Sequence, residues 1–337
     1  MRLVFCGTPL FAVPTLKHLL AQSDFEVAGV ITQPDRPRGR GQEVSFSPVK
    51  ETALAAGIPV HQPEKIRAPE AQTLLEKLSP DAIVIIAYGQ IIPARLLPIP
   101  RLGWINSHAS LLPKYRGAAP INWAIVNGET KTGVTTMRID AGMDTGEMLL
   151  QREMEIGAAE TAPELAARMS EMGAPLMAET LRGLASESIV PRAQEHALAS
   201  MAPMLKKEDG RVDWQLIAAE IFNRIRGFAP WPGAYTSFRG QTCQVWGEPA
   251  TSDLVEATGV ASVGLMPGTL VNQRGEILVA CGGGTYLRLR AVKVEGRKQV
   301  SASEFANGAR LAAGERFGEK SDGEKRKRRD GGPELQG

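Results

Sequence analysis

Hydrophobic positions in the first 190 residues follow two alternating patterns. Short apolar runs predict strands, and apolar residues spaced three and four apart predict helices between them. We expect strands at 2–7, 25–32, 81–87, 103–108 and 133–139, and helices at 11–20, 48–57, 71–78, 119–127 and 163–185. The run DAIVIIA at 81–87 is typical of a strand covered on both faces. The alternation predicts an α/β domain with a Rossmann-like, doubly wound, mainly parallel sheet.

The pattern changes beyond residue 205. A helix expected at 213–227 is followed by PWPGAY and then by short strand candidates separated by glycine, at 234–238, 242–246, 268–271, 277–281 and 286–294, with a final helix at 301–311. This spacing predicts a smaller C-terminal β-barrel. The last twenty residues, GEKSDGEKRKRRDGGPELQG, have almost no hydrophobic content and predict a disordered charged tail. We expect domains at 1–188 and 206–315, a linker at 189–205 and a tail at 316–337.

Composition narrows the class of protein. A chain of 337 residues favours two domains, and a net charge of +2 leaves nucleic-acid attraction to local patches. Three widely separated cysteines argue against a disulfide framework and a Cys-rich zinc site, and fit a reducing cytoplasm. The N-terminus lacks a signal-peptide layout, and no apolar run reaches the ~18 residues of a membrane helix. We therefore expect a cytoplasmic protein without a membrane partner.

The stretch Asn106–Pro120, NSHASLLPKYRGAAP, carries the first candidate chemistry. Asn106 and His108 are two apart at a strand end, so both side chains leave the same face, where open α/β sheets place ligands. The amide could donate to an oxyanion, and the imidazole could donate or move a proton. The alternative is a polar strand end that caps a loop. Lys114 and Arg116 suggest a handle for phosphate.

Two further segments follow strands. The first is Met137–Gly146, MRIDAGMDTG, which could bring a carboxylate to His108. The alternative is an Asp-Gly turn. Spacing alone does not determine whether Asp140 or Asp144 would be that carboxylate. Gln33–Lys50 is a basic Gly/Pro-rich segment that suits a phosphate backbone, or is a solvated surface loop. The first strand is followed by Gly7-Thr8-Pro9, where a dinucleotide-binding protein would carry the glycine fingerprint Gly-x-Gly-x-x-Gly. The missing fingerprint argues against a nicotinamide-dependent dehydrogenase.

Taken together, these segments resemble the methionyl-tRNA formyltransferase family over about residues 1–315. The motifs that carry the resemblance are FCGTPLFAVPTL, TQPDRPRGRG, SPVK, AYGQIIP, INSHASLLPKYRGAAPINWAI, TGVTTMRIDAGMDTGEML and WPGAY. The strongest is Asn106-x-His108-x-Ser110-Leu-Leu-Pro113 with Asp144 downstream, which marks the wider group of enzymes that use 10-formyltetrahydrofolate. The basic loop and the C-terminal domain narrow the choice to the tRNA enzyme.

The resemblance implies specific roles. Asn106, His108 and Asp144 would be catalytic, and no metal would be required. The folate site would be lined by Ser110, Leu111, Leu112 and Pro113 and bordered by Tyr88 and Gly89. Arg38 and above all Arg40 would contact the initiator methionyl-tRNA, and the OB-like barrel would offer a basic face drawn from Arg288, Arg290, Lys293, Arg297 and Lys298. We expect a monomer.

Other functions remain open from the sequence. The same chemistry could formylate a sugar amine or a ribonucleotide amine, or hydrolyse the formyl-folate, although these reactions need no tRNA-sized platform. A tRNA- or folate-binding regulator with an inactive site is the alternative outside enzymes.

Overall fold

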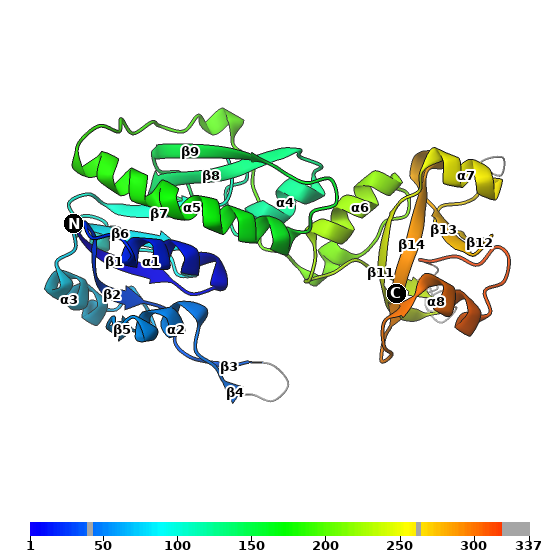
Figure 1. Ribbon diagram of the computed structural model, residues 1–337, viewed down its shortest axis with the longest axis horizontal. Helices are drawn as coiled ribbons and strands as arrows, with labels where there is room; N and C mark the ends of the chain where they lie inside the picture. Colours follow the sequence, from blue (N-terminus) through cyan, green and yellow to red (C-terminus); the bar gives the residue numbers. More distant parts are fainter. Residues whose placement is uncertain (39–42, 261–263, 319–337) are drawn as a thin grey trace, which may run out of the picture. The chain divides into compact units, whose positions relative to one another are not determined.

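The computed structural model describes residues 1–38, 43–260 and 264–318. The chain divides into two compact units. The first contains residues 1–123 and 130–204, and the second contains residues 124–129 and everything from residue 205 on. Each unit is described separately below, with element labels as in Figure 1.

The first unit is built on a seven-stranded sheet in the order β5-β2-β1-β6-β7-β8-β9. Five strands are parallel: β5 (Val60–His61), β2 (Glu26–Ile31), β1 (Arg2–Gly7), β6 (Ala82–Ile86) and β7 (Trp104–His108). The last two, β8 (Lys131–Arg138) and β9 (Met148–Glu155), are antiparallel to their neighbours. The expected Rossmann-like sheet is therefore confirmed, with antiparallel strands added at one edge.

Side chains of the central strands alternate between two cores, as the period of two requires. Leu3 and Phe5 of β1 pack with α1 (Val13–Leu20), α2 (Pro48–Ala55) and α5 (Ala162–Ala185). Val4 and Cys6, one position out of phase, pack on the other face with α3 (Pro69–Leu78) and Trp104. Helices thus cover both faces of the sheet. The parallel strands β1, β2, β6 and β7 have their carboxyl ends at the same edge of the sheet (Figure 1). The helix α4 (Pro120–Val126) follows the loop after β7.

The second unit contains a six-stranded antiparallel sheet. The hydrogen-bonded path runs β10 (Tyr235–Phe238), β11 (Gln241–Pro249), β14 (Tyr286–Val294), β13 (Glu276–Ala280) and β12 (Leu270–Gln273), with β15 (Val300–Ser301) paired to β14. Residues 315–318 bond to both ends of this path: Gly318 donates to Ser237 O, and Leu270 donates to Glu315 O. The helices of this unit are α6 (Ala218–Gly227), α7 (Ser252–Thr258) and α8 (Ala302–Ala309). The smaller antiparallel domain predicted from the sequence is present.

Five short or edge strands were not expected from the sequence: β5, β15, β9 and the two strands within the basic segment. The edge strand β9 was missed because its outer half is charged and exposed, as at Arg152 and Glu153. Within the basic segment, β3 (Pro37–Arg38) pairs with β4 (Glu43–Val44), although glycine and proline argued against regular structure there. In the described part of the chain, no helix combines the length and apolarity needed to cross a membrane.

Candidate active site

Strand β7 brings two predicted residues to the carboxyl edge of the sheet. Asn106 pairs with Ile85 of the parallel strand β6 and with Met137 of the antiparallel strand β8. Ile105, one position out of phase, belongs to the core beneath α1 and α5, so Asn106 and His108 leave the opposite face. Both side chains therefore point to one side of the same strand end.

His108 is buried and held at both ring nitrogens. Its Nε2 lies 2.9 Å from the carbonyl oxygen of Tyr115, which can only accept, so Nε2 carries the hydrogen of that bond. Its Nδ1 lies 3.6 Å from Asp144 Oδ2, and the two side chains are 6% and 17% exposed. Because 3.6 Å exceeds a normal hydrogen bond, Nδ1 keeps capacity for a further partner. Tyr115 thus fixes the ring and directs Nδ1 toward the carboxylate.

The structure distinguishes Asp144 from Asp140. Asp140 accepts bonds from Gly142 N (3.0 Å) and Thr145 Oγ1 (2.8 Å), so its carboxylate closes its own turn. Asp144 instead faces His108 and accepts from Gly117 N at 2.9 Å. Its φ of 53° is a conformation that Asp tolerates better than most residues. The loop ends at Gly146, which lies so close to the backbone that a Cβ there would be 1.9 Å from Arg138 O. Only glycine fits this position.

The segment Ser110–Pro113 forms a compact turn beside His108. Ser110 is completely buried, and its hydroxyl donates to Lys114 O at 2.6 Å. Leu112 is buried against Met137 and Met148, and the Leu112–Pro113 peptide is cis. Leu111 and Pro113 are partly exposed. Of these four residues predicted to line the folate site, only Leu111 and Pro113 have side-chain surface to offer.

Tyr88 and Gly89 lie in the loop that follows β6. The Tyr88 side chain is 2% exposed, and its hydroxyl has no hydrogen-bond partner among the described residues. Burial raises the pKa of this phenol, so it stays neutral. Its carbonyl accepts from Gln33 Nε2 at 2.9 Å, which ties this loop to the end of β2. Gly89 is exposed and has a φ of 87°, which glycine adopts without strain.

The basic segment is anchored at its base by an ion pair. Lys50 Nζ binds Asp35 Oδ2 and donates to Gln62 Oε1 at 2.8 Å. The hydrogen bond from Lys50 holds the pKa of Asp35 below its ordinary value of 3.8. Arg38 belongs to the short strand β3, whereas Arg40 lies outside the described residues.

Arg116 is not placed to bind phosphate, contrary to the expectation from the KYRG motif. It is only 6% exposed, whereas phosphate-binding arginines need access to the ligand. Its Nε and Nη2 donate to Gln194 Oε1 at 3.0 and 2.7 Å, and Nη1 lies 3.1 Å from His196 Nδ1. Gln194 in turn donates to the carbonyls of Asp144 and Gly146. Sequence reasoning missed Gln194 and assigned its segment to a linker.

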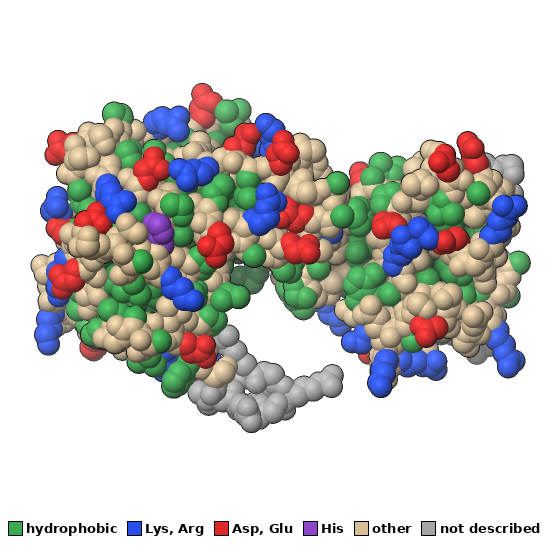
Figure 2. Space-filling model, in the orientation of Figure 1, with side chains coloured by type: hydrophobic (Ala, Val, Ile, Leu, Met, Phe, Trp, Pro, Cys, Tyr) green, Lys and Arg blue, Asp and Glu red, His purple; other side chains and the backbone are tan. Residues whose placement is uncertain are grey.

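The candidate basic face of the second unit is partly neutralised. Arg288 pairs with Glu276, and Arg290 pairs with Glu248. Lys293, Arg297 and Lys298 are exposed, and no ion pair to them is seen within the described ranges. Figure 2 likewise shows acidic and basic side chains interspersed over the visible face, with several Lys and Arg side chains along one edge of this unit.

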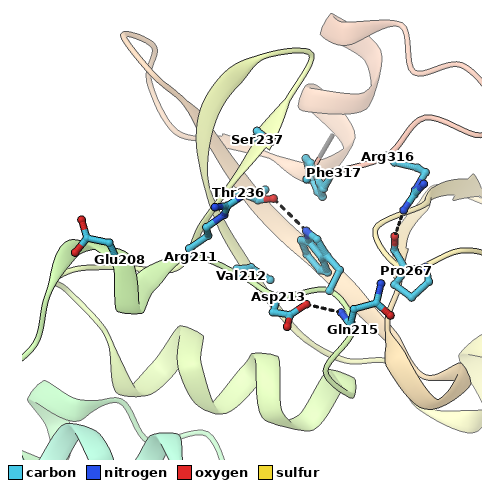
Figure 3. Close-up of a pocket in the computed structure, with 12 residues that line it drawn as sticks. Glu208, Arg211, Val212, Asp213, Gln215, Thr236, Ser237, Pro267, Arg316 and Phe317 are labelled. Atoms are coloured by element: carbon cyan, nitrogen blue, oxygen red, sulfur yellow. Dashed lines mark hydrogen bonds between the residues drawn. The ribbon is translucent and has the colours of Figure 1, made fainter. Parts of the chain in front are cut away.

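Two cavities lie apart from the predicted catalytic residues. One of about 750 Å³ in the second unit is lined by Arg211, Trp214 and Arg316, among others. Its lining is joined by hydrogen bonds: Trp214 Nε1 donates to Thr236 Oγ1 at 3.1 Å. Figure 3 also shows Gln215 bonded to Asp213, and Arg316 donating to Pro267 O at 2.8 Å. The other, of about 1110 Å³, lies between α1 and α5 and is mostly apolar. Over the described ranges, no group of three or more His, Cys, Asp or Glu is arranged to hold a metal ion.

Comparison with protein families identifies the chain as a formyl transferase. The family described as formyl transferase matches residues 1–181, and its C-terminal domain matches residues 204–310. A methionyl-tRNA formyltransferase of Solibacter usitatus is 54% identical over 95% of this chain and 99% of its own. One of Acidobacterium capsulatum is 53% identical over 94% of this chain and 100% of its own. The chain therefore belongs to the methionyl-tRNA formyltransferase family.

A solved structure shows a similar fold. The N-formyltransferase of Helicobacter canadensis, in complex with folinic acid and dTDP-3-aminofucose, superimposes with a TM-score of 0.61 at 18% identity. The match covers 86% of this chain and 98% of that one.

Proposed function

We propose that the protein transfers the formyl group of 10-formyltetrahydrofolate to the α-amino group of methionine on initiator methionyl-tRNA. The product is the N-formylmethionyl-tRNA used to begin translation, and the enzyme acts in the cytoplasm as a monomer. The observation that carries the proposal is the approach of Asp144 to His108 within 3.6 Å, at the strand end that also holds Asn106.

Asn106 and His108 stabilise the oxyanion of the tetrahedral intermediate. When the amine attacks the formyl carbon, the carbonyl oxygen becomes negative, and two donors on one face of β7 can bind it. The Asn106 amide supplies one N–H. Since Nε2–H of His108 is bonded to Tyr115 O, the second donor is Nδ1–H, which is present when the ring is the doubly protonated imidazolium. One such donor is worth about 3 to 4 kcal/mol, or about a hundred- to a thousandfold in rate.

Asp144 accepts the proton that the nitrogen loses. The new C–N bond leaves a positive charge on the attacking nitrogen, and the carboxylate beside His108 takes this proton directly or through water. The tetrahedral carbon then collapses, the bond to N10 breaks, and N10 leaves with a proton that balances the one Asp144 accepted. Until Asp144 takes that proton, its carboxylate also stabilises the imidazolium form of His108, 3.6 Å away.

The folate fits against the loops that surround this strand end. Leu111 and Pro113 supply apolar surface, and the Tyr88–Gly89 loop follows β6, the parallel neighbour of β7. Gly89 has no side chain, so a ligand can approach its backbone closely. Ser110 and Leu112 support the turn from within, since both are buried.

Arg38 and Arg40 bind the acceptor end of the tRNA. Lys50, Asp35 and Gln62 bond to one another at the base of the segment whose sequence carries these arginines. Because arginine–phosphate contacts release counterions, tRNA affinity should fall as the salt concentration rises. The exposed Lys293, Arg297 and Lys298 of the second unit provide a separate set of phosphate contacts.

The test is a comparison of acceptors. The protein is mixed with 10-formyltetrahydrofolate and, separately, initiator methionyl-tRNA, elongator methionyl-tRNA, free methionine, a dTDP-linked amino sugar or no acceptor. Formation of N-formylmethionine on the initiator tRNA, with little product from the others, is expected. Faster transfer to the amino sugar, or release of formate without an acceptor, would replace the proposed function with one of those reactions. Gel filtration measures the oligomeric state.

A further inference from the structure

The placement of Asp144 depends on a segment outside the catalytic motifs. Gln194 Nε2 donates to Asp144 O at 2.8 Å and to Gly146 O at 2.7 Å. Two carbonyls on either side of Thr145 are thus bound by one amide. Gln194 is 6% exposed, so water cannot replace these bonds without opening the loop.

The orientation of the Gln194 amide is set by Arg116. Its Oε1 accepts two bonds from the guanidinium, so Nε2 must face the Asp144 loop. Without Arg116 the amide could turn over, and its oxygen would then face two carbonyl oxygens. Arg116 is therefore what makes Gln194 a donor to the loop.

Arg116 is unusual for a buried cation. Its guanidinium bonds to the neutral Gln194 side chain and to the His196 ring, and in the described part of the chain no carboxylate lies within ion-pair distance of it. A buried charge without a counter-ion is costly, so it is expected where it serves a function. The next residue, Gly117, donates its amide N–H to Asp144 Oδ2 at 2.9 Å.

The segment that holds the Asp144 loop also contacts Tyr115, the residue that fixes His108. Tyr115 presents the carbonyl that fixes His108 Nε2, and its own N–H donates to Ser200 Oγ at 2.9 Å. Arg116 N donates to Ser200 O, and Ala202 N donates to Arg116 O. Residues 194–202 thus bind the Asp144 loop through the Gln194 side chain, and bind the Tyr115–Arg116 segment, whose Tyr115 carbonyl fixes His108, through Ser200 and Ala202.

We propose that Arg116 and Gln194 are positioning residues that hold the Asp144 carboxylate toward His108. This inference rests on the proposed formyl transfer for its kinetic readout. It also has a readout that needs no substrate: hydrogen exchange at the Gly117 amide, which donates directly to Asp144 Oδ2.

The decisive variant is Gln194→Glu. A carboxylate still accepts from Arg116, now as an ion pair, but it cannot donate to the carbonyls of Asp144 and Gly146. We expect kcat to fall at least tenfold, KM for folate and for tRNA to change less than threefold, and Gly117 exchange to accelerate at least tenfold. Thermal stability should stay near that of the wild type.

Arg116→Met and Gln194→Met provide an independent test. Each single change breaks the same chain of contacts, so the double variant should be about as slow as the slower single variant rather than showing the product of both losses. Thr180→Val is the matched control, because it removes buried hydrogen bonds to Thr136 and Leu176 in the same unit, away from residues 194–202. It should keep wild-type kcat and wild-type Gly117 exchange.

The outcomes separate cleanly. The inference is overturned if Gln194→Glu keeps wild-type kcat and wild-type Gly117 exchange. It is also overturned if the only change is in KM or in thermal stability, or if the losses in the double variant multiply. If the wild type does not formylate methionyl-tRNA, the proposed function fails, and the Gly117 exchange of Gln194→Glu and Thr180→Val still decides the positioning role.

Discussion

Replacement of Asp144 by Asn isolates the charge of the carboxylate from its shape. Asn keeps an oxygen that can accept from Gly117 N, and it tolerates the positive φ of this position. The loop should therefore keep its conformation. What is lost is the negative charge 3.6 Å from His108 Nδ1 and the ability to take a proton.

The size of the effect follows from that distance. When His108 is protonated, the two unit charges 3.6 Å apart attract by about 4 to 5 kcal/mol at an effective dielectric constant of about 20. Water reaches 17% of the Asp144 side chain and screens part of this attraction. We therefore expect kcat to fall about 10²- to 10³-fold, with both KM values changed less than threefold.

The same loop offers a matched control. Asp140→Asn keeps the oxygen that accepts from Gly142 N and Thr145 Oγ1, and within the described part of the chain no hydrogen bond or ion pair joins Asp140 to His108. We expect its kcat to stay within threefold of the wild type. The assay is formylation of initiator methionyl-tRNA under single-turnover conditions. Equal losses in the two variants, or more than a tenth of wild-type kcat in Asp144→Asn, would refute the assignment of the base.

Three further predictions concern neighbouring parts of the first unit. Asn106→Ala should lower kcat about 10²- to 10³-fold, since one oxyanion donor is lost, while tRNA binding measured by filter retention stays within threefold. Arg40→Ala should raise KM for tRNA, leave folate affinity unchanged in a fluorescence titration, and reduce the slope of log affinity against log salt by about 1. Lys50→Met should lower the free energy of unfolding by about 1 to 3 kcal/mol at pH 7. Because Lys50 holds the pKa of Asp35 below 3.8, urea titrations should show this difference persisting above that pH and shrinking as the pH falls through the lowered value.

Each of these predictions can fail in its own way. Loss of tRNA binding in Asn106→Ala that matches the loss of activity would remove the residue from the chemistry. A drop in folate affinity in Arg40→Ala would contradict the placement of the basic segment. A stability difference for Lys50→Met that grows on acidification would mean that the ion pair with Asp35 is not its source.

Much of the fold could be predicted because its signals are local. A wholly apolar run such as 82–86 identifies a buried central strand without reference to the rest of the chain. Strand β9 has no such signal, since an edge strand keeps one face and one end in water, and Glu153 and Glu155 obscure the alternation. The short pairing of β3 with β4 was missed because two residues on each side are too few to form a pattern.

The site divides along the same line. Asn106 and His108 are two residues apart on one strand, so their common face follows from the pleat. The choice between Asp140 and Asp144 depends on how a loop closes, and spacing does not determine that. Arg116 and Gln194 are 78 residues apart, and only the folded chain shows that they meet. An arginine between a nearby lysine and a glycine, as in KYRG, suggests phosphate binding, and the burial of Arg116 contradicts that prediction.

The most direct measurement follows a ¹³C-labelled formyl group from 10-formyltetrahydrofolate in a single turnover with initiator methionyl-tRNA, using the wild type and Asp144→Asn side by side. If Asp144 accepts the amine proton, the label should appear on the methionine nitrogen with the wild type, and far more slowly with the variant. Label released as formate by the wild type, or transferred equally fast by both proteins, would contradict this expectation.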